Sequence, residues 1–274
     1  MAKYSDIKGF TVQTVSTDPA ASLAATGSWS SGGSLGAGRR LYNQTAGTST
    51  AGLAFGGYTS TAVNSTEKYD GTSWTEVNEM NNTKYVSSGD GTQTAAFTAG
   101  GTPGPNSQLN EHWNGTNWTE GDGSLVTGRI GLAAAGVVTA AVVFGGEAAS
   151  GGDTGATELY NGSTWAEQTD LSQARYLSSG VGTSTAALCF GGQPGPGSTA
   201  FFALNESWNG ASWTTLDSMN TARAGGGRAG IQTSALFFGG STPPNSDSAL
   251  TEFWNGSTWT ELSDLSTANE DIGG

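Results

Sequence analysis

Short apolar segments alternate with glycine-rich polar segments along the whole chain. One such segment, AALCF at 186–190, ends at a pair of glycines, and a shorter segment with a Glu and an aromatic residue, ESW at 206–208, follows after a loop. An Asn-Gly pair then precedes a segment that begins with Trp. Apolar runs this short, bounded by turn residues, predict β-strands rather than helices. The Asn-Gly pairs predict tight hairpins, because both residues tolerate a positive φ.

This four-strand pattern recurs around six tryptophans. They are Trp29, Trp74, Trp118, Trp165, Trp213 and Trp259, with spacings of 45, 44, 47, 48 and 46 residues. The path from Trp259 through the C-terminus and on from Met1 to Trp29 is 44 residues long, which fits the same period. A closed ring requires such a fit and a linear solenoid does not. We therefore predict an all-β fold, a six-bladed β-propeller with four antiparallel strands per blade, as a single domain over residues 1–274.

The repeat also predicts where each blade begins. Five units cover about residues 37–81, 82–126, 127–171, 172–219 and 220–265, and the sixth blade combines residues 266–274 with residues 1–36. Strands from the two ends of the chain would then clasp one blade and close the ring.

Composition narrows the class of protein further. Only 12% of the residues are charged and 44 are glycine, which disfavours helix bundles. Large aromatic rings at regular positions argue against a disordered chain. The net charge is −13 and no cluster of Lys or Arg interrupts it, so we expect no nucleic-acid partner. The uncharged stretch at 130–146 aligns with strands of the other repeats, and the chain begins without a secretory signal pattern, so we expect neither membrane insertion nor a signal peptide.

Two repeat positions carry opposite charges. The cations are Arg40, Lys84, Arg129, Arg175 and Arg223, each 16 residues before a double glycine, and the carboxylates are Glu67, Glu111, Glu158, Glu206 and Glu252. In an antiparallel blade they lie at the same end, two strands and roughly 9–10 Å apart. We predict structural ion pairs over the double glycines. The alternative is a positive ring at the channel mouth that binds an acidic glycan. The divided blade has Asn269 and Ala24 at these positions.

No arrangement of residues predicts catalysis. The single histidine, His112, and the single cysteine, Cys189, exclude sites that need several imidazoles or thiolates. We interpret His112 as a strand residue and Cys189 as a buried thiol. The run Gly225 to Gly230 satisfies a GxGxxG pattern, but no helix follows it to receive a phosphate. We therefore expect no catalytic residues, no cofactor and no metal.

The repeat resembles the Kelch motif. The similarity rests on the double glycine, the E-x-[YW]-[DN]-G-x-x-W segment and the N-T-A-R-like lead into the next unit, and it covers nearly the whole chain. This resemblance implies a propeller, but Kelch propellers include both enzymes and binding modules. The Ser/Thr/Ala/Gly-rich segments GTSTAGLAFGG and YDGTSWTE also resemble segments of Kelch-like virion proteins of marine bacteriophages.

The strand-two to strand-three loops differ from unit to unit, and variable loops on a rigid frame commonly carry binding residues. We expect Phe201, Phe202, Pro103 and Pro243 in these loops to contact a partner. The alternative for Phe201 and Phe202 is local packing beneath their loop.

The predicted function is a non-enzymatic structural or adhesion protein of a bacteriophage virion, in a tail fibre or as capsid decoration. Its partners would be other virion proteins or a host-surface glycan, and its oligomeric state is left open. The alternative is a cellular, cytoplasmic propeller that binds glycans or proteins. A third hypothesis, an enzyme such as a glycosidase, is weaker because the catalytic set is lacking.

Overall fold

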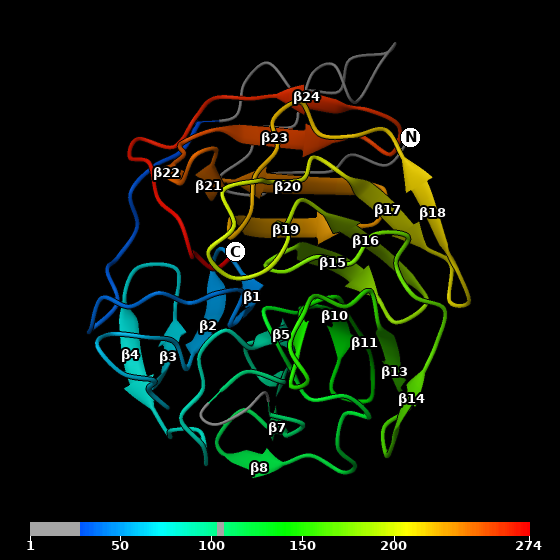
Figure 1. The fold of residues 1–274 in the computed structure, drawn as a ribbon. Coiled ribbons are helices and arrows are strands. Elements are labelled where there is room, and N and C mark those ends of the chain that lie inside the picture. The colour runs from blue at the N-terminus through cyan, green and yellow to red at the C-terminus, as the bar shows by residue number, and fades with distance from the viewer. Residues whose placement is uncertain (1–27, 103–106) are drawn as a thin grey trace, which may run out of the picture.

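The protein is described by a computed structural model that covers residues 28–102 and 107–274. These residues form β-strands and connecting loops, arranged as five four-stranded antiparallel sheets around a common centre (Figure 1). In each sheet the strands lie side by side in chain order, from the innermost to the outermost. The predicted all-β propeller with four-stranded antiparallel blades is confirmed. The described residues include no helix that could cross a membrane.

The sheets have similar strand lengths. The first contains β1 (Thr45–Thr48), β2 (Ala51–Phe55), β3 (Thr66–Tyr69) and β4 (Trp74–Val77), and the second contains β5 (Ser88–Thr92), β6 (Ala95–Ala99), β7 (Asn110–Trp113) and β8 (Trp118–Glu120). The third contains β10 (Ala133–Val137), β11 (Ala140–Phe144), β13 (Thr157–Tyr160) and β14 (Trp165–Glu167). The fourth contains β15 (Ser179–Thr183), β16 (Ala186–Phe190), β17 (Asn205–Trp208) and β18 (Trp213–Leu216), and the fifth contains β19 (Gly227–Ile231), β20 (Ser234–Phe238), β23 (Thr251–Trp254) and β24 (Trp259–Glu261). Two short pairs, β9 (Arg129–Ile130) with β12 (Glu147–Ala148) and β21 (Ser241–Thr242) with β22 (Ser246–Asp247), lie outside these sheets.

One end of the blades, here called the turn face, has the same turns in all five sheets. Every inner hairpin turns through two residues and every outer hairpin through four. The second-last residue of each innermost strand is a glycine with positive φ: Gly47, Gly91, Gly136, Gly182 and Gly230. A Cβ on Gly91 would lie only 2.4 Å from the carbonyl oxygen of Ala95, so a side chain does not fit there.

The opposite end, here called the loop face, carries the connections between the second and third strands. Their lengths vary, from ten residues at 56–65 to fourteen at 191–204. Each begins with the double glycine, which also joins neighbouring blades. Gly192 donates its backbone N–H to the carbonyl oxygen of Arg223 in the next unit at 2.9 Å. A Cβ on Gly191 would lie 2.6 Å from the same oxygen, which explains why glycine occupies this position.

Aromatic rings fill the space between neighbouring blades. Phe55 of the first blade packs edge-on against Trp118 of the second, with ring centroids 5.0 Å apart. Phe144 and Trp213 repeat this contact between the third and fourth blades at 4.8 Å. The tryptophans of the repeat therefore lie mainly in the core between blades, as aromatic side chains with large apolar surfaces commonly do.

The structure shows five four-stranded sheets, one fewer than the six predicted. Most of the predicted sixth blade, including Ala24, falls in residues 1–27 and lies outside the described residues. The C-terminal segment occupies the gap between the first and fifth blades, where Gly274 accepts a hydrogen bond from Thr45 Oγ1 at 2.7 Å. Asn269 accepts the backbone N–H of Gly240 at 2.8 Å, as the repeat cations do in the intact blades.

Trp29 also follows the repeat. Its ring packs on Phe238 of the fifth blade, with centroids 4.8 Å apart, and its Nε1 donates to the carbonyl oxygen of Ser263 at 3.1 Å. Trp74 makes the corresponding bond to Gly33 at 3.1 Å. The segment around Trp29 thus lies between the outer strands of the fifth and first blades.

Candidate functional site

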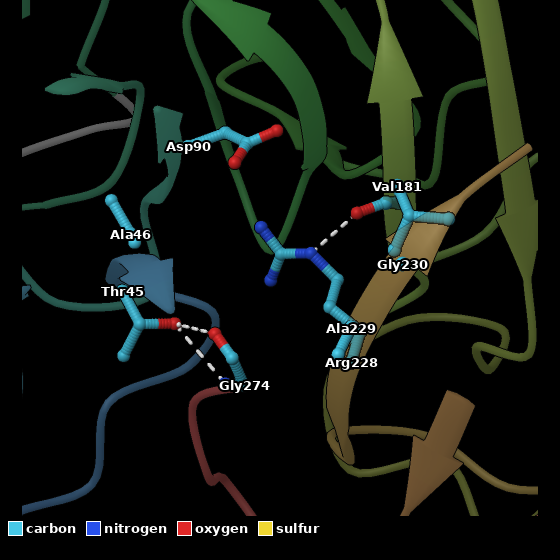
Figure 2. A pocket seen from close by; sticks show the side chains of 10 residues that line it. Thr45, Ala46, Asp90, Val181, Arg228, Ala229, Gly230 and Gly274 are labelled. Carbon is cyan, nitrogen blue, oxygen red and sulfur yellow. Dashed lines mark hydrogen bonds between the residues drawn. The ribbon is translucent and has the colours of Figure 1, made fainter. Parts of the chain in front are cut away.

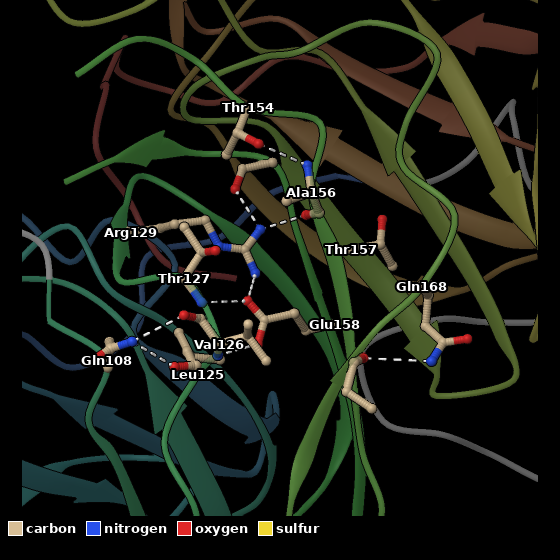
Figure 3. Close-up of polar contacts among 12 residues, drawn as sticks. Gln108, Leu125, Val126, Thr127, Arg129, Thr154, Ala156, Thr157, Glu158 and Gln168 are labelled. Atoms are coloured by element: carbon tan, nitrogen blue, oxygen red, sulfur yellow. Dashed lines mark hydrogen bonds and ion pairs between the residues drawn. The ribbon is translucent and has the colours of Figure 1, made fainter. Parts of the chain in front are cut away.

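The repeated cation and glutamate meet inside the third blade, at the loop face (Figure 3). Arg129, in β9, donates from Nη2 to Glu158 Oε1 at 2.8 Å, and both side chains are fully buried. Arg129 Nη1 donates to the carbonyl oxygens of Gly145 and Ala156. Burial lowers the pKa of Arg129, while the Glu158 carboxylate opposes that shift. A charge pair with this many internal partners is part of the scaffold rather than a ligand site.

The same pairing occurs in two further blades. Arg175 pairs with Glu206, and Arg223 Nη2 lies 2.9 Å from Glu252 Oε1. The glutamates also accept backbone N–H groups from the segment that enters the blade, such as Asn220 N to Glu252 Oε2 at 2.7 Å. Each pair therefore fixes the entering segment as well as the double glycine.

The second blade satisfies the cation differently. Lys84 Nζ donates to the carbonyl oxygens of Gly100, at 3.2 Å, and Leu109, at 2.8 Å, and is not placed in a direct ion pair with Glu111. The shorter lysine reaches the carbonyl oxygens that are equivalent to those contacted by the arginines in their own blades. Burial lowers the pKa of Lys84 to about 8, although Glu111 opposes the shift.

In the first blade the predicted pairing of Arg40 with Glu67 is wrong. Arg39 contacts Glu67 instead, at 2.5 Å. Arg40 pairs in the backbone with Tyr58 and takes the place that Tyr85 has in the second blade. Its guanidinium is half exposed and lies 3.0 Å from Asp271 Oδ2.

Three of the predicted partner-binding residues, Phe201, Phe202 and Pro243, lie on the loop face with unequal exposure. Phe201 and Phe202 are half-buried, and the backbone of Phe202 is held by bonds to Gly192 and Arg223. Pro243 is exposed. Pro103 lies outside the described residues.

Tyrosines that the sequence analysis missed gather on the loop face: Tyr42 and Tyr85 precede innermost strands, and Tyr58 follows β2. The rings of Tyr58 and Tyr85 have centroids 5.0 Å apart, and Tyr42 lies 6.2 Å from Tyr85. Burial and the Asp271 carboxylate raise the pKa of Tyr42 to about 12. Burial, reinforced by Glu270, raises the pKa of Asp271 to about 6. These residues combine aromatic faces with a half-exposed guanidinium, which suits contact with polar rings.

A second feature that the sequence analysis missed lies in the central channel (Figure 2). Arg228, dismissed within the glycine run, is only 5% exposed and extends from β19 across the centre. It donates from Nε to Gly180 at 2.5 Å and from Nη2 to Gly89 at 2.8 Å, which ties three blades together. Asp90 of β5 lines the same space. The only sequence signal was that both break a pattern of small residues.

The other residues considered in the sequence analysis, His112 and Cys189, pack within the fold. His112 is half-buried with its ring against Tyr160, centroids 5.5 Å apart, and burial lowers its pKa. Cys189 is buried, and burial raises the pKa of its thiol. Within residues 28–102 and 107–274, no three His, Cys, Asp or Glu side chains are grouped to hold a metal ion.

The sequence matches no protein-family model, and no curated protein shows significant similarity to it.

Proposed function

We propose that the protein is a non-enzymatic recognition module of a bacteriophage virion, in a tail fibre or as capsid decoration. Its loop face would bind a host-surface glycan or another virion protein. The observation that carries this proposal is the contrast between the two ends of the blades. The turn face has identical turn lengths in all five sheets, whereas the loops of the other end vary from ten to fourteen residues. Variation on a constant frame is typical of recognition surfaces.

The loop face also offers suitable chemistry. The rings of Tyr58 and Tyr85 pack together, and Tyr58 pairs in the backbone with Arg40, whose guanidinium is half exposed. Aromatic faces stack on sugar rings and on apolar side chains alike, and a guanidinium donates hydrogen bonds to hydroxyl or carboxylate groups. The buried arginines of the repeat are internally paired, so the positive-ring alternative has little support.

For the architecture, we propose that a sixth blade closes the ring, built from residues 266–274 and 1–36, and that the repeat is of the Kelch type. The contacts of Trp29 and Asn269 support this proposal, because each repeats a contact of the intact blades. The Kelch assignment rests on the sequence motif alone.

The loop-face proposal is tested by paired variants of the full chain. Binding to host-cell envelopes is measured by co-sedimentation. The apparent Kd should rise about tenfold, which is roughly 1.4 kcal/mol, in Phe201→Ser with Phe202→Ser and separately in Tyr58→Ala with Arg40→Ala. Val137→Ser with Ile231→Ser is the matched control, because both residues are exposed on the turn face, at 45% and 58%. Thermal unfolding of each variant checks that the fold is retained.

Loss of binding in the turn-face variant alone would overturn this assignment of the faces. Hydrolysis of an envelope glycan by the purified protein would overturn the non-enzymatic role. Mass spectrometry of purified phage particles tests the virion location: detection of the chain supports it, and absence from particles that infect normally favours the cellular alternative.

A further inference from the structure

The central channel holds two charged side chains where the repeat has small residues. At the position of Arg228 the other innermost strands carry Thr45, Gly89, Ala134 and Gly180. At the position of Asp90 they carry Ala46, Ala135, Val181 and Ala229. The propeller therefore forms without either charge in most of its sectors, and the two charges need a separate explanation.

Only some of the hydrogen-bond donors of the Arg228 side chain have partners. Nε and Nη2 donate to carbonyl oxygens, but the buried Nη1 has no hydrogen-bond partner. An unpartnered guanidinium N–H in a buried site is costly, so a ligand or solvent group that accepts this bond would be favoured.

Asp90 is the opposite charge in this space. Its Oδ1 and Oδ2 accept the backbone N–H groups of Gly91, at 2.7 Å, and Gly136, at 3.0 Å. Figure 2 shows no bond between Asp90 and Arg228. Each carboxylate oxygen has capacity for a second donor.

A cavity of about 120 Å³ lies between these groups, with Thr45, Val181 and Gly274 among its lining residues. That is the space of about four water molecules. Ala229 and Gly230 on its rim are exposed, so the cavity is reached from the turn face.

We propose that this cavity binds a small zwitterion, such as a free amino acid with a small side chain. Its carboxylate would accept the Nη1–H of Arg228, and its ammonium group would donate to Asp90. An anion alone would gain from Arg228 but be repelled by Asp90, and a cation alone would meet the reverse. A zwitterion satisfies both charges at once. This site lies in the central channel, and the proposal does not depend on the function of the loop face.

The probes are glycine, acetate, methylammonium and betaine, each at about 100 mM, with thermal unfolding of the full chain as the readout. A ligand of so few atoms should bind with a Kd of about 1 mM, so saturating glycine should raise the Tm by several degrees. Betaine controls for general solute effects, because it is zwitterionic but has no N–H to donate. Glycine should stabilise more than each of the other three.

Two variants link the effect to the cavity. Arg228→Ala and Asp90→Ala each install the residue that another sector carries at that position, and each should abolish the excess shift from glycine. If Arg228→Ala does not fold, Asp90→Ala carries the test alone. A glycine shift no larger than that of betaine, a shift equalled by acetate, or one retained in Asp90→Ala would overturn the proposal.

Discussion

The indole Nε1 of Trp29 donates a hydrogen bond to Thr251 Oγ1 at 3.1 Å, although 222 residues separate them in the chain. Trp118 makes the same bond to Thr66, from the second blade to the first, at 2.9 Å. Trp29 therefore contacts the fifth blade in the same way as Trp118 contacts the first blade. This relationship places Trp29 where the outer strand of the proposed sixth blade would begin, and it predicts that ring closure depends on both ends of the chain.

The closure account predicts that deletion of residues 268–274 destabilises the protein. Among the bonds that the deletion removes are those in which Asn269 accepts from Gly240, Asp271 accepts from Arg40 and Gly274 accepts from Thr45. At about 1 kcal/mol for each bond, these three alone should lower the Tm by roughly 6–12 °C in thermal unfolding. The exposed substitution Val126→Ser is the control and should leave the Tm nearly unchanged. A deletion variant with the same Tm as the full chain would contradict this account.

The buried ion pairs predict a large asymmetry between single and double substitutions. Arg223→Met leaves Glu252 buried without its cation, so the free energy of unfolding should fall by about 3–5 kcal/mol, as measured by denaturant titration. Arg223→Met combined with Glu252→Met removes both charges and should restore only part of that loss, because the backbone N–H of Asn220 and the carbonyl oxygens of Gly239 and Leu250 lose their partners. Arg40→Met, at a half-exposed cation, should cost only about 0–1 kcal/mol. Equal losses at Arg223 and Arg40 would show that the buried pair has no special role.

Lys84→Arg should stabilise the second blade. The substitution installs the residue that the third, fourth and fifth blades use, and its longer side chain can reach Glu111 while keeping the bonds to Gly100 and Leu109. One charge-assisted hydrogen bond contributes about 1.5–3 kcal/mol, so the Tm should rise by several degrees. The reciprocal change, Arg129→Lys, is the matched test and should lower the Tm. An unchanged or lower Tm for Lys84→Arg would mean that the second blade differs in backbone rather than in side-chain length.

The sequence alone predicted the features that depend on local repeated patterns. Double glycines, Asn-Gly turns and regularly spaced tryptophans each specify a backbone or packing requirement, so the propeller and the pairs at Arg129, Arg175 and Arg223 followed from them. Arg40 did not, because counting back from the double glycine assumes equal strand lengths. The first unit has two consecutive non-glycine residues with positive φ, Tyr42 and Asn43, at 48° and 69°. This local distortion accommodates one additional residue, and a shift of one residue reverses the direction of each side chain.

The channel residues could not be predicted from the repeat for a different reason. Arg228 and Asp90 occur once each, so a repeat comparison treats them as exceptions. Only the closed ring places β5 and β19 on opposite sides of one cavity. Pairings across an axis involve distant sectors and leave no regular spacing in the chain.

Asp271 predicts an unusual pH dependence of stability. Burial and the nearby Glu270 raise its pKa from 3.8 to about 6 in the folded protein, while Arg40 and Tyr42 oppose the shift. Between these two pKa values the folded state holds the proton and the unfolded state does not. The contribution of Asp271 to the free energy of unfolding therefore falls as pH rises from about 4 to 6, by on the order of 3 kcal/mol.

Asp271→Asn isolates this contribution, because the amide does not titrate. The Tm of the variant minus that of the natural sequence should increase as pH rises from about 4 to 7, and level off above that range. Asp70→Asn is the control of opposite sign. Backbone N–H groups of Ser73 and Thr72 lower the pKa of exposed Asp70, so its contribution is lost only as pH falls below about 4. The Tm difference for Asp70→Asn should therefore stay flat between about pH 5 and 7. A flat difference for Asp271→Asn over the same interval would show that its carboxyl ionises normally and that the closing segment is more hydrated than its contacts indicate.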